Sequence, residues 1–149
     1  MRAVVTRVLS ASVEIEGSIY SSIGSGLLVL VGSEEGDTVT DYHYICDKVT
    51  NLRIFHDDEG KMNRSIREVG GEIMIVSQFT LLGDARKGRR PSFIRSGDPA
   101  EAKGRYEEFL KEFEKEGIPF RTGVFQAEMK VASVNNGPVT ILLDSRKVF

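Results

Sequence analysis

The chain is poor in the residue types on which many active sites depend. Its 149 residues include one cysteine, Cys46, and two histidines, His43 and His56. A single cysteine excludes an internal disulfide and fits a reducing cytoplasm, and we expect Cys46 to be a buried structural thiol. Neither histidine has partners at zinc-site spacing, so the sequence predicts no metal site.

Familiar catalytic motifs are absent as well. The sequence contains no Gly-x-Ser-x-Gly elbow, P-loop or dinucleotide-binding fingerprint. Neither histidine lies in a recognisable Ser-His-Asp setting, and no pair of isolated carboxylates is apparent for acid–base chemistry. The sequence therefore predicts no bound cofactor and does not favour a hydrolase built on side-chain acids and bases.

Long hydrophobic runs are also missing. No apolar run approaches the roughly 20 residues that span a bilayer. The first residues alternate like a strand and lack the apolar region of a signal peptide. Hydrophobic residues make up 40% and charged residues 28% of the chain, as in ordinary globular proteins. We therefore expect residues 1–149 to form one cytoplasmic domain with one core and no membrane partner.

Charge is unevenly distributed along the chain. The net charge is −2, but the segment Gly83–Gly97 has a local charge of +4, which leaves −6 for the rest. Its bases are Arg86, Lys87, Arg89, Arg90 and Arg95, and its one acid is Asp84. A basic segment on an acidic protein indicates a localised anionic partner, although a solvated loop would have the same composition.

Hydrophobic periodicity predicts an α+β fold with helices packed on a large mixed or antiparallel sheet. The apolar run Gly26–Gly32 and the run Glu72–Phe79 predict buried strands. Apolar residues spaced by three or four predict a first helix. These are Val39, Tyr42, Ile45, Val49 and Leu52.

A second helix has clear end signals. Asp98 is the expected N-cap, Pro99 the first helical residue, Glu101 the reciprocal capping-box partner and Gly117 the end. Its apolar stripe is Ala102, Tyr106, Phe109, Leu110 and Phe113. We expect two main helices and about eight strands.

Two pairs of strands are expected to be joined by turns. Residues 52–55 and 61–63 are expected to form a hairpin through an acidic turn that lacks the ligand spacing of a calcium loop. Near the end of the chain, strands over 124–134 and 139–144 are joined by Asn135-Asn136-Gly137-Pro138. Asn-Gly favours a tight turn, while Pro138 brings no N–H and its bond to Gly137 can be cis. In isolation this segment is typical of a surface turn.

A cluster of small polar groups ends the strongest strand. Ser77, Gln78 and Thr80 offer hydroxyls, an amide and backbone N–H groups that could bind a carbonyl oxygen and stabilise its developing charge. On a strand, Ser77 and Phe79 would face one side and Gln78 and Thr80 the other. Polar residues that leave a sheet into a loop would have the same composition, so this segment alone does not establish a site.

Taken together, these segments resemble the D-aminoacyl-tRNA deacylases, enzymes that remove D-amino acids from mischarged tRNA. The likeness covers nearly the whole chain and includes Met1–Val8, Leu52–Phe55, Gly60–Asn63, Val76–Leu81, Lys87–Phe93 and Gly137–Thr140. The resemblance implies a homodimer of a three-layer α/β/β fold, with two active sites at the subunit interface.

The resemblance also implies roles for individual residues. One wall of the pocket would hold the catalytic segment Ser77, Gln78, Phe79 and Thr80, and the other subunit would insert Gly137 and Pro138. Arg7 would brace the proline motif, and Phe125 and Met129 would hold the terminal adenosine of tRNA. The tRNA acceptor end would be contacted by Arg86, Lys87, Arg89 and Arg90. Gln126 stands where the family usually has glycine, which leaves the details of the adenosine pocket open.

The implied activity is hydrolysis of the ester that links a D-amino acid, or glycine, to tRNA. The Gly137-Pro138 corner would exclude L side chains, the ribose 2′-hydroxyl would help activate water, and N–H groups near Phe79 and Thr80 would stabilise the oxyanion. Two alternatives remain open: a small-molecule esterase with Thr80 as covalent nucleophile, and a non-enzymatic dimeric RNA-binding module that uses Arg86–Arg90.

Overall fold

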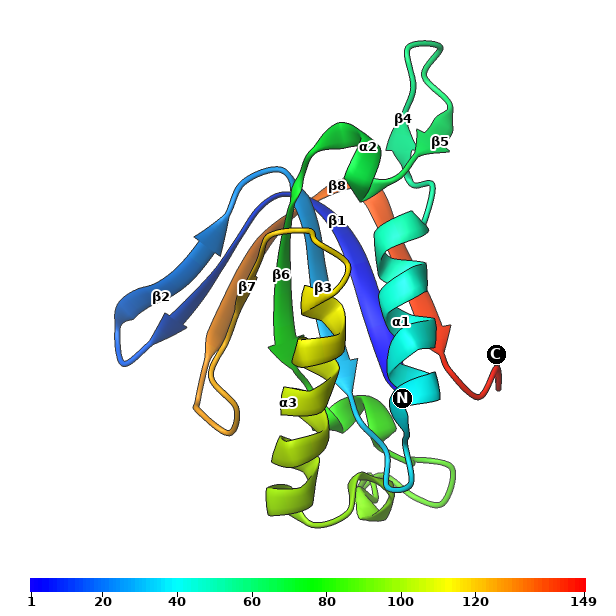
Figure 1. The fold of residues 1–149 in the computed structure, drawn as a ribbon. Coiled ribbons are helices and arrows are strands. Elements are labelled where there is room, and N and C mark those ends of the chain that lie inside the picture. The colour runs from blue at the N-terminus through cyan, green and yellow to red at the C-terminus, as the bar shows by residue number, and fades with distance from the viewer.

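A computed structural model of residues 1–149 shows a large twisted sheet with helices over one face (Figure 1). The strands of this sheet are β1 (Arg2–Ile15), β2 (Ser18–Ile23), β3 (Gly26–Gly32), β6 (Glu72–Ser77), β7 (Phe120–Thr122) and β8 (Lys130–Asp144). The order is β2-β1-β3-β6-β7, and β8 also pairs with β1. The pairings of β1 are antiparallel, whereas β3 with β6 and β6 with β7 are parallel. The predicted mixed sheet is confirmed.

Helices cover the face of the sheet that carries the larger of two apolar clusters (Figure 1). The helices are α1 (Val39–Asn51), α2 (Ile66–Val69) and α3 (Pro99–Glu114), with 3-10 turns η1 (Phe79–Leu82) and η2 (Ile94–Ser96). Val29 and Ile75 of the sheet pack with Ile45 of α1 and Phe109 of α3 in the main core. A smaller cluster, including Leu28, Met74 and Val76, lies on the opposite face. None of the helices is long and apolar enough to cross a membrane.

The two main helices begin where the sequence predicts, with two differences in detail. The Asp98 carboxylate accepts hydrogen bonds from Ala100 N at 2.8 Å and Glu101 N at 3.4 Å, which caps α3. The reciprocal bond expected from Glu101 is not made, because its carboxylate lies toward Arg105, 3.7 Å from Nη1. Val39 was expected on the apolar face of α1 but is 50% exposed; it is the first residue of the helix, and the buried residues of α1 begin at Tyr42.

The expected hairpin over residues 52–63 is present as a small separate sheet. Strands β4 (Phe55–His56) and β5 (Met62–Arg64) pair antiparallel and project from the body of the molecule (Figure 1). Asp57 organises the turn by accepting hydrogen bonds from Glu59 N and Lys61 N, both at 2.9 Å. The acidic turn is therefore held by its own backbone.

The end of the chain corrects the sequence prediction. Residues 124–134 and 139–144 were expected to be two strands joined by a turn, but β8 is a single strand that begins at Lys130 and runs antiparallel along β1. Thr6 pairs with Thr140 and Val8 with Asn135, so Arg7 faces the four residues between. The long strand β1 offers one continuous edge, so the parts of β8 before and after the Asn-Asn-Gly-Pro segment both pair with it and run in the same direction. The Asn-Asn-Gly-Pro segment itself bulges out of the pairing.

Candidate functional site

A cavity of about 520 Å³ opens where β6 ends, between the start of α3 and the loop that follows β7. Its walls include Ser77, Gln78 and Phe79, and also Phe125 and Met129, so two groups predicted from the sequence come together. The remaining lining residues are Val76, Ser96, Gly97, Pro99, Ala102, Gln126, Ala127 and Val131. The sequence had singled out Gln126 and missed the other seven as lining residues, although the cap signal at Asp98-Pro99 marks the helix start that forms one wall.

The polar segment at the end of β6 presents free backbone donors. Gln78 N donates to Val31 O at 2.6 Å, which extends the sheet by one residue. The chain then turns into η1, where Leu81 N donates to Gln78 O at 3.2 Å. The N–H groups of Phe79 and Thr80, the first two of this turn, have no acceptor within the chain. They are available to bind an anionic oxygen.

Thr80 does not line the cavity and has no base beside it. Its hydroxyl accepts a hydrogen bond from Gln78 Nε2, which is the one side-chain hydrogen bond that Thr80 makes. An amide cannot take a proton from a hydroxyl in the way that imidazole or carboxylate does. The geometry therefore suits Thr80 for positioning the segment rather than for nucleophilic attack.

The basic loop is packed directly against this segment. Phe93 contacts Phe79 edge to face, with ring centroids 5.2 Å apart and an angle of 68° between the rings. Asp84 and Ser92 close the loop with reciprocal backbone hydrogen bonds of 2.8 and 2.9 Å. A side chain at Gly83 would begin 2.9 Å from Phe93 Cε1, so glycine is required for this close approach.

Two of the five bases in the loop are engaged within the chain. Arg86 donates to Asp84 from Nε at 2.9 Å and from Nη2 at 2.5 Å, and this pairing holds the pKa of the Asp84 carboxyl well below its usual range. Arg95 forms a bidentate pair with Glu34, at 2.7 and 2.8 Å. The other three bases, Lys87, Arg89 and Arg90, are exposed and make no hydrogen bond or salt bridge within the chain.

The wall opposite Ser77 and Phe79 is largely apolar. Phe125 packs on Tyr106, with ring centroids 5.8 Å apart and an angle of 31° between the rings. Met129 folds back over its own loop, where its sulfur accepts a hydrogen bond from Val124 N at 3.4 Å. Burial raises the pKa of the Tyr106 hydroxyl, which keeps this ring neutral behind the wall. An aromatic ring and a thioether suit a flat hydrophobic ligand such as a nucleobase.

The Gly137-Pro138 corner lies elsewhere in the same chain. The peptide bond is cis, and both residues are exposed. Arg7 is only 3% exposed and donates from Nε to Asn136 O at 2.9 Å and from Nη1 to Ile54 O at 2.5 Å. In the order β8-β1-β3-β6, the corner is three strands from the cavity. It faces Arg7, which is in register with Leu27 and Ile73, four residues before Ser77, so the separation is roughly 19 Å. One chain does not bring Gly137 and Pro138 to Ser77 and Phe79.

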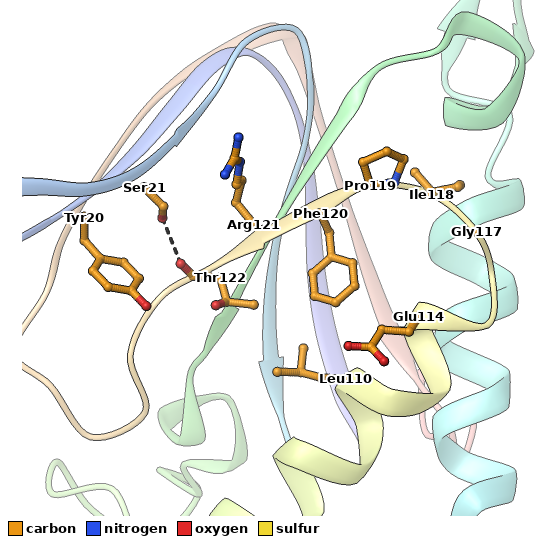
Figure 2. A pocket seen from close by; sticks show the side chains of 10 residues that line it. All are labelled: Tyr20, Ser21, Leu110, Glu114, Gly117, Ile118, Pro119, Phe120, Arg121 and Thr122. Atoms are coloured by element: carbon orange, nitrogen blue, oxygen red, sulfur yellow. Dashed lines mark hydrogen bonds between the residues drawn. The ribbon is translucent and has the colours of Figure 1, made fainter.

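A second cavity is lined by none of the site residues predicted from the sequence. This cavity has a volume of about 750 Å³ and lies around β7, between β2 and the second half of α3. Figure 2 shows the side chains that line it. Ser21 Oγ donates to Thr122 O at 2.8 Å at one end, and Glu114 and Gly117 lie at the other. The cavity at the end of β6 is the better candidate site, because it alone brings together the predicted residues Ser77, Gln78 and Phe79 with Phe125 and Met129.

Cys46 and His43, which the sequence did not place in any catalytic motif, have structural roles. Cys46 is buried, and burial raises the pKa of its thiol to about 12, so it is not a reactive thiolate. His43 pairs with Glu112 at 2.7 Å on the surface of the helical layer. No three of the His, Cys, Asp and Glu side chains are gathered so that they could hold a metal ion.

Comparison with known proteins identifies close relatives. A family model described as D-Tyr-tRNA(Tyr) deacylase matches residues 4–144. D-aminoacyl-tRNA deacylases from Thermoanaerobacter sp. (strain X514) and Clostridium botulinum (strain Eklund 17B / Type B) are 53% and 55% identical over 149 residues, the full length of both chains in each case.

Solved structures share the fold. A structure described as c-Myc DNA Unwinding Element Binding Protein has a TM-score of 0.91 and 39% identity, and covers 97% of this chain and 98% of its own. A probable eukaryotic D-amino acid tRNA deacylase has a TM-score of 0.76 over 95% of this chain and 97% of its own, and at 18% identity it supports the fold alone.

Proposed function

The chain belongs to the D-Tyr-tRNA(Tyr) deacylase family, and from that premise we propose that it hydrolyses the ester bond of D-aminoacyl-tRNA, releasing the D-amino acid and free tRNA. The observation that carries this proposal is the cavity at the end of β6, where free N–H donors lie across from an apolar, aromatic wall. A deacylation assay with D-tyrosyl-tRNA tests it directly.

The apolar wall fits the terminal adenosine of tRNA. Phe125 and Met129 offer a ring face and a polarisable sulfur, which bind a purine through its faces. An adenosine held there places its aminoacylated ribose toward Ser77 and Phe79 on the other wall. The ester carbonyl is then within reach of the N–H groups of Phe79 and Thr80, which stabilise the negative charge that develops on its oxygen.

The general base in this proposal comes from the substrate. Ser77, Gln78 and Thr80 are the polar side chains of the segment, and none of them accepts a proton readily at neutral pH. The vicinal 2′-hydroxyl of the terminal ribose is fixed beside the scissile ester and helps to activate the attacking water. RNA is therefore required for the chemistry as well as for binding.

A second copy of the chain completes the site. Leu142, Val4, Leu30 and Val76 are neighbours in register across β8, β1, β3 and β6, on the face away from the helices. Leu142 is 59% exposed, and Leu30 packs with the smaller apolar cluster. A twofold-related copy on this face buries the strip and carries its Gly137-Pro138 corner to the Ser77–Thr80 segment.

The corner supplied by the second copy selects the substrate by exclusion. Gly137 and Pro138 present backbone atoms and a rigid ring, held by the contact between Arg7 and Asn136 O. A rigid backbone wall facing the α-carbon leaves room for the side chain of a D-amino acid but not for that of an L-amino acid. Glycine has no side chain to exclude, so glycyl-tRNA is also a substrate.

Replacing Thr80 with Ala tests whether its hydroxyl is a nucleophile. We expect deacylation to fall about tenfold, because one net hydrogen bond, that from Gln78, contributes about 0.5–1.5 kcal/mol. Rates of D-tyrosyl-tRNA hydrolysis by the two proteins measure this, and Thr80→Ser, which keeps the hydroxyl, is the control. A loss of several orders of magnitude, or a trapped acyl-Thr80 ester, would instead favour a covalent esterase.

The free bases of the loop should contact phosphates of the tRNA acceptor end. Arg86 is hydrogen-bonded to Asp84, whereas Arg89 and Arg90 are exposed and unpaired, so the double variant Arg89→Ala with Arg90→Ala tests the phosphate contacts best. We expect weaker binding to all tRNAs alike and a salt dependence reduced by up to about 2 in slope. Binding measured from low to moderate salt checks this, with exposed Lys111→Ala as the control. An unchanged slope would leave the loop with a packing role only.

A further inference from the structure

Gln126 has a backbone conformation that is unfavourable for its side chain. Its φ is +63°, in the left-handed region that glycine adopts freely and other residues adopt at a cost. It lies in a tight turn in which Ala127 N donates to Val124 O at 3.2 Å. Glu16 and Lys147 are the other two non-glycine residues with positive φ, and neither lines the cavity. Gln126 does.

Gln126 is positioned so that its side-chain amide can contact a ligand in the cavity. It lines the cavity between Phe125 and Ala127, near Met129, and these three neighbours in the same loop offer no polar side chain. Gln78 is the other amide in the lining, and it is already bonded to Thr80. The Gln126 amide makes no hydrogen bond within the chain, so one acceptor and two donors are available at the apolar end of the cavity.

We propose that Gln126 is a specificity-determining residue that recognises the edge of the adenine base; this inference rests on the proposed function, which puts the terminal adenosine in this cavity. The faces of a purine can be held by Phe125 and Met129, but such contacts do not distinguish one purine from another. A glutamine amide pairs with adenine N6–H and N7 through its oxygen and its NH₂ group. Gln126 adds the hydrogen bonds that the apolar wall lacks.

Two glycine variants separate this role from backbone strain. Gln126→Gly removes both the strain and the amide, whereas Glu16→Gly removes comparable strain in the turn between β1 and β2. We expect both variants to melt about 2–4 °C higher than the parent protein. Only Gln126→Gly should change recognition of the substrate, since Glu16 is outside the cavity.

The substrates for the test are D-tyrosyl-tRNAs that end in adenosine, 7-deazaadenosine or purine riboside. The two analogues lack N7 and the N6 amino group respectively. We expect the parent protein and Glu16→Gly to lose about three- to tenfold in kcat/KM with each analogue. Gln126→Gly should hydrolyse all three at similar kcat/KM, with a raised KM for the adenosine substrate and an unchanged kcat.

The outcomes separate this inference from the proposed function. If the parent protein hydrolyses all three substrates equally well, or if Gln126→Gly discriminates among them as the parent does, Gln126 does not recognise the base and the deacylase assignment stands. If the parent protein hydrolyses none of them, the proposed function fails and the inference fails with it.

Discussion

A D-aminoacyl-tRNA that ends in 2′-deoxyadenosine, charged on its 3′-hydroxyl, is expected to be hydrolysed about 10²–10⁴-fold more slowly than the natural substrate, because general-base assistance contributes a factor of this size. The polar side chains of the segment Ser77–Thr80 are Ser77, Gln78 and Thr80, and none is a base at neutral pH. The affinity of the protein for this tRNA should change little, since the proposed contacts of the adenine faces and of the phosphates do not involve the 2′-hydroxyl.

Single-turnover rates and dissociation constants for the two substrates make this measurement. A tRNA with a single deoxyribose at the penultimate nucleotide is the matched control, and it should behave like the natural substrate. If the terminal deoxy substrate is hydrolysed at the normal rate, the catalytic base belongs to the protein. Thr80, whose hydroxyl is hydrogen-bonded only to Gln78, would then be the first candidate for the nucleophile.

The second large effect is expected at Arg7. Arg7→Ala leaves Asn136 O and Ile54 O without their donor at a buried position. Hydrogen bonds from a charged group contribute about 1.5–3 kcal/mol each, so we expect the free energy of unfolding to fall by several kcal/mol. Displacing the Gly137-Pro138 corner by about 1 Å should also lower deacylation by roughly 10²-fold, because the corner borders the reacting centre in the proposed site.

Arg7→Lys and Arg53→Ala sharpen this test. Lysine keeps the charge but lacks the planar fork that reaches two carbonyls, so Arg7→Lys should restore part of the stability and little of the activity. Arg53 also donates to a backbone carbonyl, that of Asn63, but from the exposed hairpin away from the corner. Urea unfolding and D-tyrosyl-tRNA hydrolysis are measured for all three variants. Full activity in a folded Arg7→Ala protein would contradict the proposal that Arg7 braces the Gly137-Pro138 corner.

Local signals predicted most of the secondary structure. The continuous apolar run that became β3 and the Asp98-Pro99 cap of α3 depend on neighbouring residues, and both are confirmed. The shape of β8 depends instead on β1, more than a hundred residues earlier in the chain. No local pattern indicates that one long strand will pair with residues on both sides of the Asn-Asn-Gly-Pro segment, so the sequence favoured a turn.

In the candidate site, too, the features that depend on neighbouring residues were predicted and those that depend on distant residues were not. The polar segment Ser77–Thr80 was visible because it ends a strong strand, whereas Ser96, Pro99 and Val131 reach the cavity only through the packing of distant elements. Charge counting treated the loop bases alike. Folding then engages Arg95 through Glu34, 61 residues away, which the sequence pattern could not reveal.

The most direct test of the central claim compares D-tyrosyl-tRNA with L-tyrosyl-tRNA as substrates for the purified protein under identical conditions. The proposed site predicts rapid release of D-tyrosine and no hydrolysis of the L ester above the spontaneous rate. Equal hydrolysis of both esters, or hydrolysis of neither, would contradict the account.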